Sequence, residues 1–186
     1  MLVLGTGIGY TLTQSSVGRG GMHMMSGGSE MRQNIDQHFI VQMIPHHEGA
    51  IAMAEIALER SKRPEIISLA NGIIEAQERE IAEMKSWYQD WFGSAPPQGG
   101  MGTEHGMHMD GMTGDNDELR SVSDAQFDRE FIDQMIPHHE MAVMMASMLE
   151  SSTARDEMRT LADNIITSQS REIEMMRIWR TSWYGN

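Results

Sequence analysis

Two stretches of this chain are nearly the same. Residues 39–48 read Phe-Ile-Val-Gln-Met-Ile-Pro-His-His-Glu, and residues 131–140 read Phe-Ile-Asp-Gln-Met-Ile-Pro-His-His-Glu. A shift of 131 − 39 = 92 positions aligns residues 39–93 with residues 131–185 without a gap, and 26 of the 55 aligned pairs are identical. A match of this length indicates an internal duplication, so the fold is expected to contain two similar units.

Each repeat is predicted to form two helices. Ser29 in the first repeat, and Ser123 with Asp124 in the second, are residues that favour the start of a helix. Pro64 suits the first turn of the second helix, and Gly93 suits its end. One face of that helix is apolar at steps of three and four residues, through Ala70, Ile74, Gln77, Ile81, Met84, Tyr88 and Trp91. The second repeat predicts helices over about 124–152 and 155–184.

These helices predict an all-α fold, a four-helix bundle built from two duplicated helical hairpins. Either hairpin alone would leave its apolar seam in water, so one domain is expected over 29–185. Within it, 29–93 forms the first hairpin, 94–122 a Met/His-rich linker and 123–185 the second hairpin. Residues 1–28 are expected to be a flexible leader. Pro45 lies inside the first predicted helix and is expected to bend it.

The amino-acid composition excludes several kinds of chemical site and of binding partner. Among its 186 residues the chain has 20 Met, 8 His and no Cys, with a formal net charge of −13. The absence of Cys excludes disulfides, thiolate zinc sites and thiol nucleophiles. The negative charge argues against nucleic acid and against an anionic membrane surface as partners. The excess of Met over His favours thioether as the main ligand for any bound metal.

Two glycine-rich segments predict soft-metal binding outside the helices. Met is a good core filler, but a glycine-rich loop has no core to fill. Thioether sulfur is a soft donor suited to Cu(I), and imidazole suits copper in general. The candidate ligands are Met22, His23, Met24 and Met25 in the leader, and Met101, His105, Met107, His108, Met109 and Met112 in the linker.

The repeated helical motif is a second candidate. Met43 can share a helix face with His46 or His47, which lie three and four residues later, and Met53 lies two turns beyond His46. The second repeat places Met135, His138, His139 and Met145 in the same way. Simple packing of these side chains remains an alternative. Two adjacent His beside a proline in both repeats favour metal ligation.

The sequence leaves the roles of two glutamines open, and it lacks the motifs of several common enzyme classes. Gln77 and Gln169 on the apolar seam could orient a His or set the helix register. Trp87, Trp91, Trp179 and Trp183 are expected to pack at the ends of the bundle. No His has a Glu three residues before it, so a di-iron site is disfavoured. Motifs for phosphate loops and nucleophile elbows are also missing.

The segment 42–54, Gln-Met-Ile-Pro-His-His-Glu-Gly-Ala-Ile-Ala-Met-Ala, resembles the bacterial family DUF305. The resemblance covers about 30–93 and 122–185 and implies a ferritin-like bundle, copper binding, copper tolerance and frequent export. Carried over by position, it implies metal ligands at Met43, His46, His47, Met53 and Met84, and at Met135, His138, His139, Met145 and Met176.

Together these features predict a non-enzymatic protein that sequesters Cu(I) or passes it to a copper-transfer protein, with Ag(I) as a mimic. The alternatives are a metal-dependent cuprous oxidase and a structural bundle with incidental Met. A periplasmic or otherwise exported location is expected, although no Lys or Arg precedes Arg19 and the export signal is therefore incomplete.

Overall fold

The computed structural model describes residues 27–97 and 116–185. Those residues form helices and no strand, as the all-α prediction requires. The elements are α1 (Gly27–Arg60), α2 (Pro64–Phe92), α3 (Asn116–Ser121), α4 (Asp124–Ser152) and α5 (Asp156–Tyr184). Among the described helices, none combines the length and the hydropathy that a membrane span requires.

Most predicted helix ends are confirmed. Pro64 opens α2, Ser123 is the N-cap of α4, and Gly93 ends α2 with a left-handed φ of 73°. The start of the first helix was predicted wrongly: α1 begins at Gly27, two residues before Ser29, and so includes the last two residues of the expected leader. A helix that is already growing can extend into glycine at modest cost, because each added residue gains a hydrogen bond.

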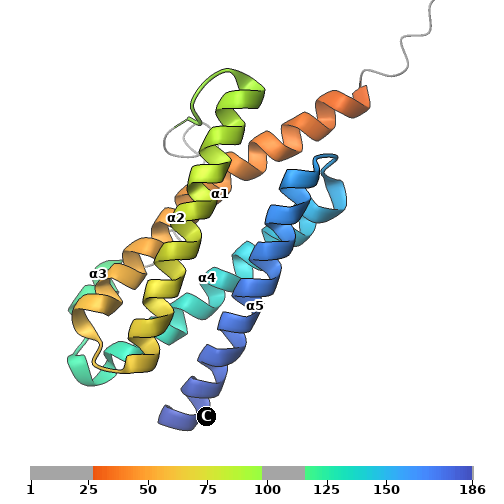
Figure 1. Cartoon of the computed structure of the whole chain (residues 1–186). Coiled ribbons are helices and arrows are strands. Elements are labelled where there is room, and N and C mark those ends of the chain that lie inside the picture. Colours follow the sequence, from red (N-terminus) through yellow and green to blue (C-terminus); the bar gives the residue numbers. More distant parts are fainter. Residues whose placement is uncertain (1–26, 98–115, 186) are drawn as a thin grey trace, which may run out of the picture.

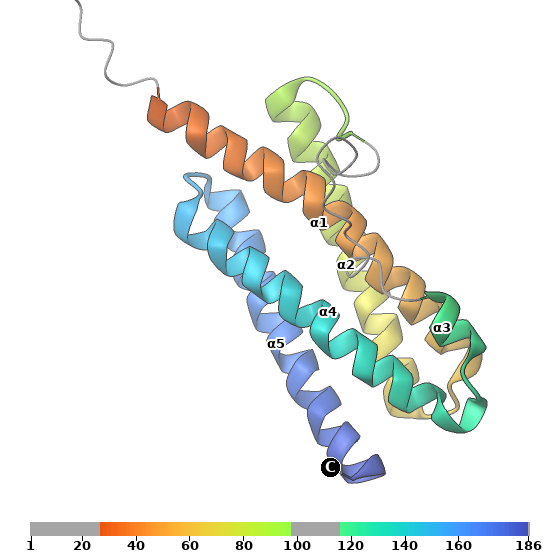
Figure 2. The same cartoon turned by 180° about the vertical axis from the view of Figure 1, so that it is seen from behind.

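The four long helices form two hairpins that lie side by side. The α1–α2 pair and the α4–α5 pair are the hairpins, and α1 packs against α4 between them. Figure 1 shows α2 and α5 in the front layer with α1 and α4 behind, and Figure 2 shows the same arrangement from the other side. The two helices that carry the repeated motif therefore meet in one layer.

Reciprocal contacts join the hairpins at their turns. Arg155 forms an ion pair with the buried Asp36 at 3.3 Å and lies over the Trp91 ring. The equivalent Arg63 pairs with Asp128 at 3.1 Å and lies over Trp183. The predicted packing role of the tryptophans is confirmed by these contacts and by stacking within each pair, Trp87 on Trp91 and Trp179 on Trp183.

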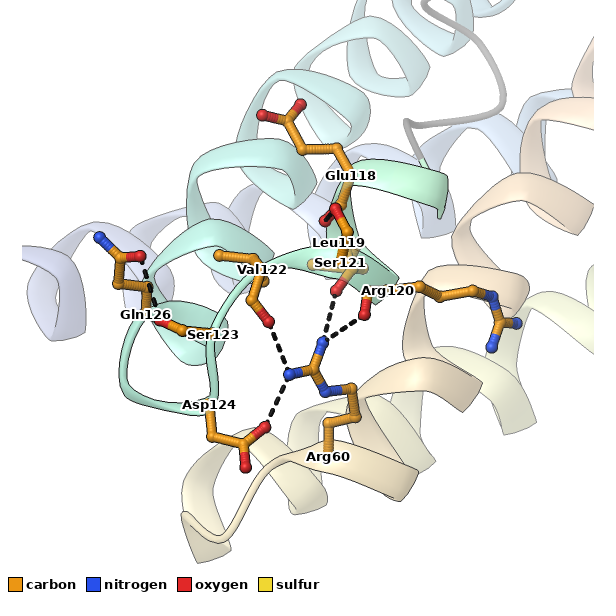
Figure 3. A network of polar contacts seen from close by, with 9 residues as sticks. All are labelled: Arg60, Glu118, Leu119, Arg120, Ser121, Val122, Ser123, Asp124 and Gln126. Atoms are coloured by element: carbon orange, nitrogen blue, oxygen red, sulfur yellow. Dashed lines mark hydrogen bonds and ion pairs between the residues drawn. The ribbon is translucent and has the colours of Figure 1, made fainter.

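The helix α3 corrects the prediction for residues 94–122, which were expected to form only a Met/His-rich linker between the hairpins. Figure 3 shows how Arg60, at the end of α1, holds this region. Its guanidinium donates hydrogen bonds to the carbonyl oxygens of Leu119, Arg120 and Val122, and pairs with Asp124 at 2.6 Å. A six-residue helix is unstable by itself, so these tertiary contacts decide that it forms.

Two hydrophobic cores occupy opposite ends of the structure. One contains Phe39, Met43, Tyr88, Leu149 and Leu161, and the other contains Met53, Leu69, Leu119, Phe131 and Met176. Halfway along each long helix, buried polar side chains interrupt the series of buried apolar ones, at 46–47, 77–80, 138–139 and 169–172. A polar layer therefore lies between the two cores.

Candidate metal centre

Four histidines from α1 and α4 form the centre of the polar layer. His46, His47 and His139 are 0% exposed and His138 is 3% exposed. The rings of His46 and His138 lie 3.8 Å apart between centroids and are tilted by 42°. Within each motif the adjacent rings, 46 with 47 and 138 with 139, are 6.3 Å apart. The two repeats thus bring their predicted site histidines together, which spacing along one helix could not show.

A carboxylate from the partner helix of each hairpin holds one histidine of each motif. The Nε2 atom of His47 lies 2.7 Å from Glu80, and the Nε2 atom of His139 lies 2.8 Å from Glu172. When the carboxylate is ionised and the imidazole is neutral, Nε2 carries the hydrogen and Nδ1 keeps its lone pair, because an ionised carboxylate only accepts hydrogen bonds. Both Nδ1 atoms are buried without a hydrogen-bond partner among the described residues. This arrangement prepares Nδ1 as a metal ligand.

His46 is kept neutral by its surroundings. The pKa of His46 is lowered from 6.5 to about 2, first by burial and then by the neighbouring His138, His47 and His139. Neither ring nitrogen of His46 has a hydrogen-bond partner in the described part of the chain. A buried polar group without a partner is costly, and a soft or borderline metal ion would satisfy it.

The six predicted ligand methionines of the helices divide between the two cores. Met43 and Met84 belong to the first core, with Met145 packed at its edge. Met135, Met176 and Met53 belong to the second. Each set therefore combines two methionines of one hairpin with a third from the other hairpin. All except Met145 are 0% exposed. The sequence prediction grouped each set of methionines with the histidines of its own repeat, whereas packing exchanges Met53 and Met145 between the two cores.

The described residues contain no group of three or more His, Cys, Asp or Glu placed to hold a metal ion. A zinc-like site made of nitrogen and oxygen ligands is therefore not formed by those residues. The donor atoms nearest to this layer are imidazole nitrogen and, in the two adjoining cores, thioether sulfur. That ligand mixture fits a soft ion and agrees with the excess of Met in the chain.

The two glutamates were not among the site residues predicted from the sequence. Glu80 and Glu172 align in the two repeats and follow Gln77 and Gln169 by three residues, which puts each pair on one helix face. That spacing was an available signal. Gln77 and Gln169 are 3% exposed, and each amide oxygen lacks a hydrogen-bond partner among the described atoms. Their predicted role, in orienting a His or setting the register, stays a prediction.

The other candidate ligands cannot be placed. Met22, His23, Met24 and Met25 lie outside the described residues, as do Met101, His105, Met107, His108, Met109 and Met112. Metal binding by these two segments stays a prediction.

Comparison with known proteins shows the family and the fold of this chain. Residues 36–180 match the model of a family described as a domain of unknown function, DUF305. The chain belongs to the DUF305 family. The DUF305 match spans the whole of the histidine layer and both cores, so the resemblance seen in the sequence is confirmed.

Solved DUF305-like structures have the same fold. The chain is 51% identical to CopM in its Cu(I)-bound form, with a TM-score of 0.69, and the match covers 81% of this chain and 98% of CopM. CopM has also been solved in Cu(II)-bound, Ag-bound and apo forms. A DUF305 protein of Streptomyces coelicolor, described as a candidate secreted protein, is 27% identical with a TM-score of 0.67, over 76% of this chain and 89% of that one.

A curated relative matches a shorter part of the chain. A protein of Acanthamoeba polyphaga mimivirus is 45% identical over 51 residues, which is 27% of this chain. The match spans 34% of the viral protein, so it concerns one segment of each molecule.

Proposed function

We propose that this DUF305 protein binds Cu(I) through sites that combine Met and His ligands, and that Ag(I) binds there as a mimic. The proposed role of this binding is copper tolerance. The observation that carries the proposal is the buried histidine layer, where His46, His47 and His139 have bare ring nitrogens beside two methionine-containing cores. Neutral imidazole and thioether together suit Cu(I). The metal-bound forms of CopM, at 51% identity, support copper as the ion.

The proposed architecture is one domain, a ferritin-like four-helix bundle made of two duplicated hairpins. Its centre would supply the tighter sites, because packing holds the side chains before metal arrives and little conformational entropy is lost on binding. The glycine-rich segments that contain Met22 and Met101 would add weaker, exchangeable sites, since fixing the backbone of one residue costs about 1–2 kcal/mol. Such a division suits sequestration of copper or its transfer to another copper-binding protein.

The proposed location is the periplasm or another exported compartment of the cell envelope. The Streptomyces coelicolor relative, with its description as a candidate secreted protein, supports this location. Copper ions, with a transfer protein as recipient, are the proposed partners. The net charge of −13 disfavours nucleic acids and anionic membrane surfaces.

Metal analysis of the protein purified from copper-fed cells tests the proposal. We expect copper well above the background of a control protein of similar size and charge purified in parallel. Copper at or below that background would remove the proposed function. Oxygen consumption measured with Cu(I) separates binding from catalysis: uptake that continues over many turnovers would favour a cuprous oxidase, and stoichiometric binding without turnover would exclude it.

A further inference from the structure

A separate group of methionines lies on the surface of α4. Met144 is 57% exposed and Met148 is 66% exposed, and the half-buried Met141 lies one turn before Met144. The described residues have four exposed large hydrophobic side chains, and these two methionines, four residues apart, are half of them. We call Met141, Met144 and Met148 the α4 methionine face.

Helical geometry brings these thioethers within reach of one another. Steps of three and four residues place Met141, Met144 and Met148 along one side of α4. Side chains four residues apart have Cβ atoms about 6 Å from each other. Each Met side chain is unbranched and flexible, so the sulfur atoms of Met144 and Met148 can converge on one ion between them.

The duplication supplies an internal comparison. A shift of 92 residues aligns the α4 methionine face with Gly49, Ala52 and Ile56, none of which contains sulfur. Ile56 is 0% exposed, whereas its counterpart Met148 is 66% exposed. The packing of α3 against α1 explains the difference, because its buried Leu119 lies in the same core as Ile56.

No described helix covers Met148 in the way that α3 covers α1. Core packing therefore does not account for methionine at 144 and 148. Exposed thioethers gain nothing from water and are open to oxidation. A ligand role explains both the residue type and the spacing.

The charge around the face is compatible with a cation. From His139 to Ser152, α4 contains no Lys or Arg, and it carries Glu140 and Glu150. Arg177 of α5 lies near this region but is paired with Glu140. A monovalent cation therefore meets no unpaired positive side chain on α4 itself beside the methionines.

We propose that Met144 and Met148, with Met141 as a third donor, form a surface site for a soft monovalent cation, Cu(I) or Ag(I), distinct from the histidine layer. The choice of metal rests on the proposed function. The placement rests on the exposure and spacing of the three methionines. Because the site is open, it is expected to exchange its ion faster than the buried centre.

Methionine-methyl NMR of the full chain, titrated with Ag(I), tests this site directly. We expect the Met144 and Met148 methyl signals to shift together. The double variant M144L/M148L should bind one Ag(I) fewer per chain by native mass spectrometry. Leu keeps the volume and helix propensity at these exposed positions, so the variant should fold. The variant I178L, which alters a 58% exposed side chain without sulfur, is the matched control and should bind like the parent.

The outcomes separate the two proposals. If the Met43 and Met135 signals shift with Ag(I) while those of Met144 and Met148 do not, the surface site is wrong and the proposed function stands. If none of the four responds, both are wrong. If the Met144 and Met148 signals move with protein concentration but not with Ag(I), the face is a protein contact and the metal site is overturned.

Discussion

The Nε2 atom of His47 lies 2.7 Å from a carboxylate oxygen of Glu80 in the interior of the first hairpin. The same relationship recurs between His139 and Glu172 at 2.8 Å in the second. The carboxylate sets the tautomer and the orientation of the ring. A pair retained in both repeats is therefore a sensitive place to test the proposed centre.

The variant E80Q should weaken Cu(I) binding at the buried centre by about tenfold, the lower end of the effect of losing such a partner. Gln can still accept a hydrogen bond from His47, but it lacks the negative charge. Competition with a colorimetric Cu(I) chelator measures the change. The control is E83Q, which removes an exposed carboxylate from the same helix. Equal affinities for E80Q and E83Q would show that the Glu80 contact is structural.

Replacement of His46, His47, His138 and His139 by Ala should remove the tighter class of Cu(I) site. These imidazoles are buried and fixed by packing, so they bind with little loss of entropy. The matched control is H38A, since His38 is an exposed histidine on α1. Titration against the colorimetric Cu(I) chelator measures the affinity of each variant, and circular dichroism confirms that the variant is still helical. If the fourfold variant unfolds, H46Q alone is titrated. Parent-like binding by a folded variant contradicts the assignment.

Deletion of residues 99–112 should lower the total copper capacity while leaving the fold and at least one Cu(I) site intact. The deletion removes four Met and two His but leaves α3 and the Arg60 contacts in place. Metal analysis measures the copper capacity of the deletion variant, and circular dichroism shows whether its helices are retained. Loss of all Cu(I) binding in a folded deletion variant would place the ligands in the linker and not in the bundle.

Acid should destabilise the apo protein through His46. Its pKa is about 2 in the folded chain against 6.5 as the ordinary value, so between these pH values the unfolded chain binds a proton that the native state does not. Stability therefore falls as pH drops below 6.5, by up to about 1.4 kcal/mol per pH unit from this one group.

Urea unfolding at pH 7 and pH 5 measures that effect. The variant H46L should flatten the pH dependence, whereas H38Q should keep it. A parent-like slope in H46L would mean that His46 is not the group held neutral by the fold.

Local sequence was sufficient for the four long helices, except for the start of α1. Steps of three and four residues, Pro64 at a start and Gly93 at an end specify α2, because these signals act within a few residues of each other. The 92-residue repeat predicted two similar hairpins, and the Met43, His46 and His47 motif predicted the helix positions of the centre. These features depend on backbone geometry along one helix.

Tertiary structure alone decided which helix faces meet. Periodicity shows that Glu80 is on the seam of α2, but only the packed hairpin brings it to His47, 33 residues earlier. It also decided that Met145 joins the core of Met43, and that α3 buries Ile56 while its counterpart Met148 stays open. Packing depends on surfaces far apart in the chain, and identical repeats acquire different environments when a segment such as α3 covers one of them.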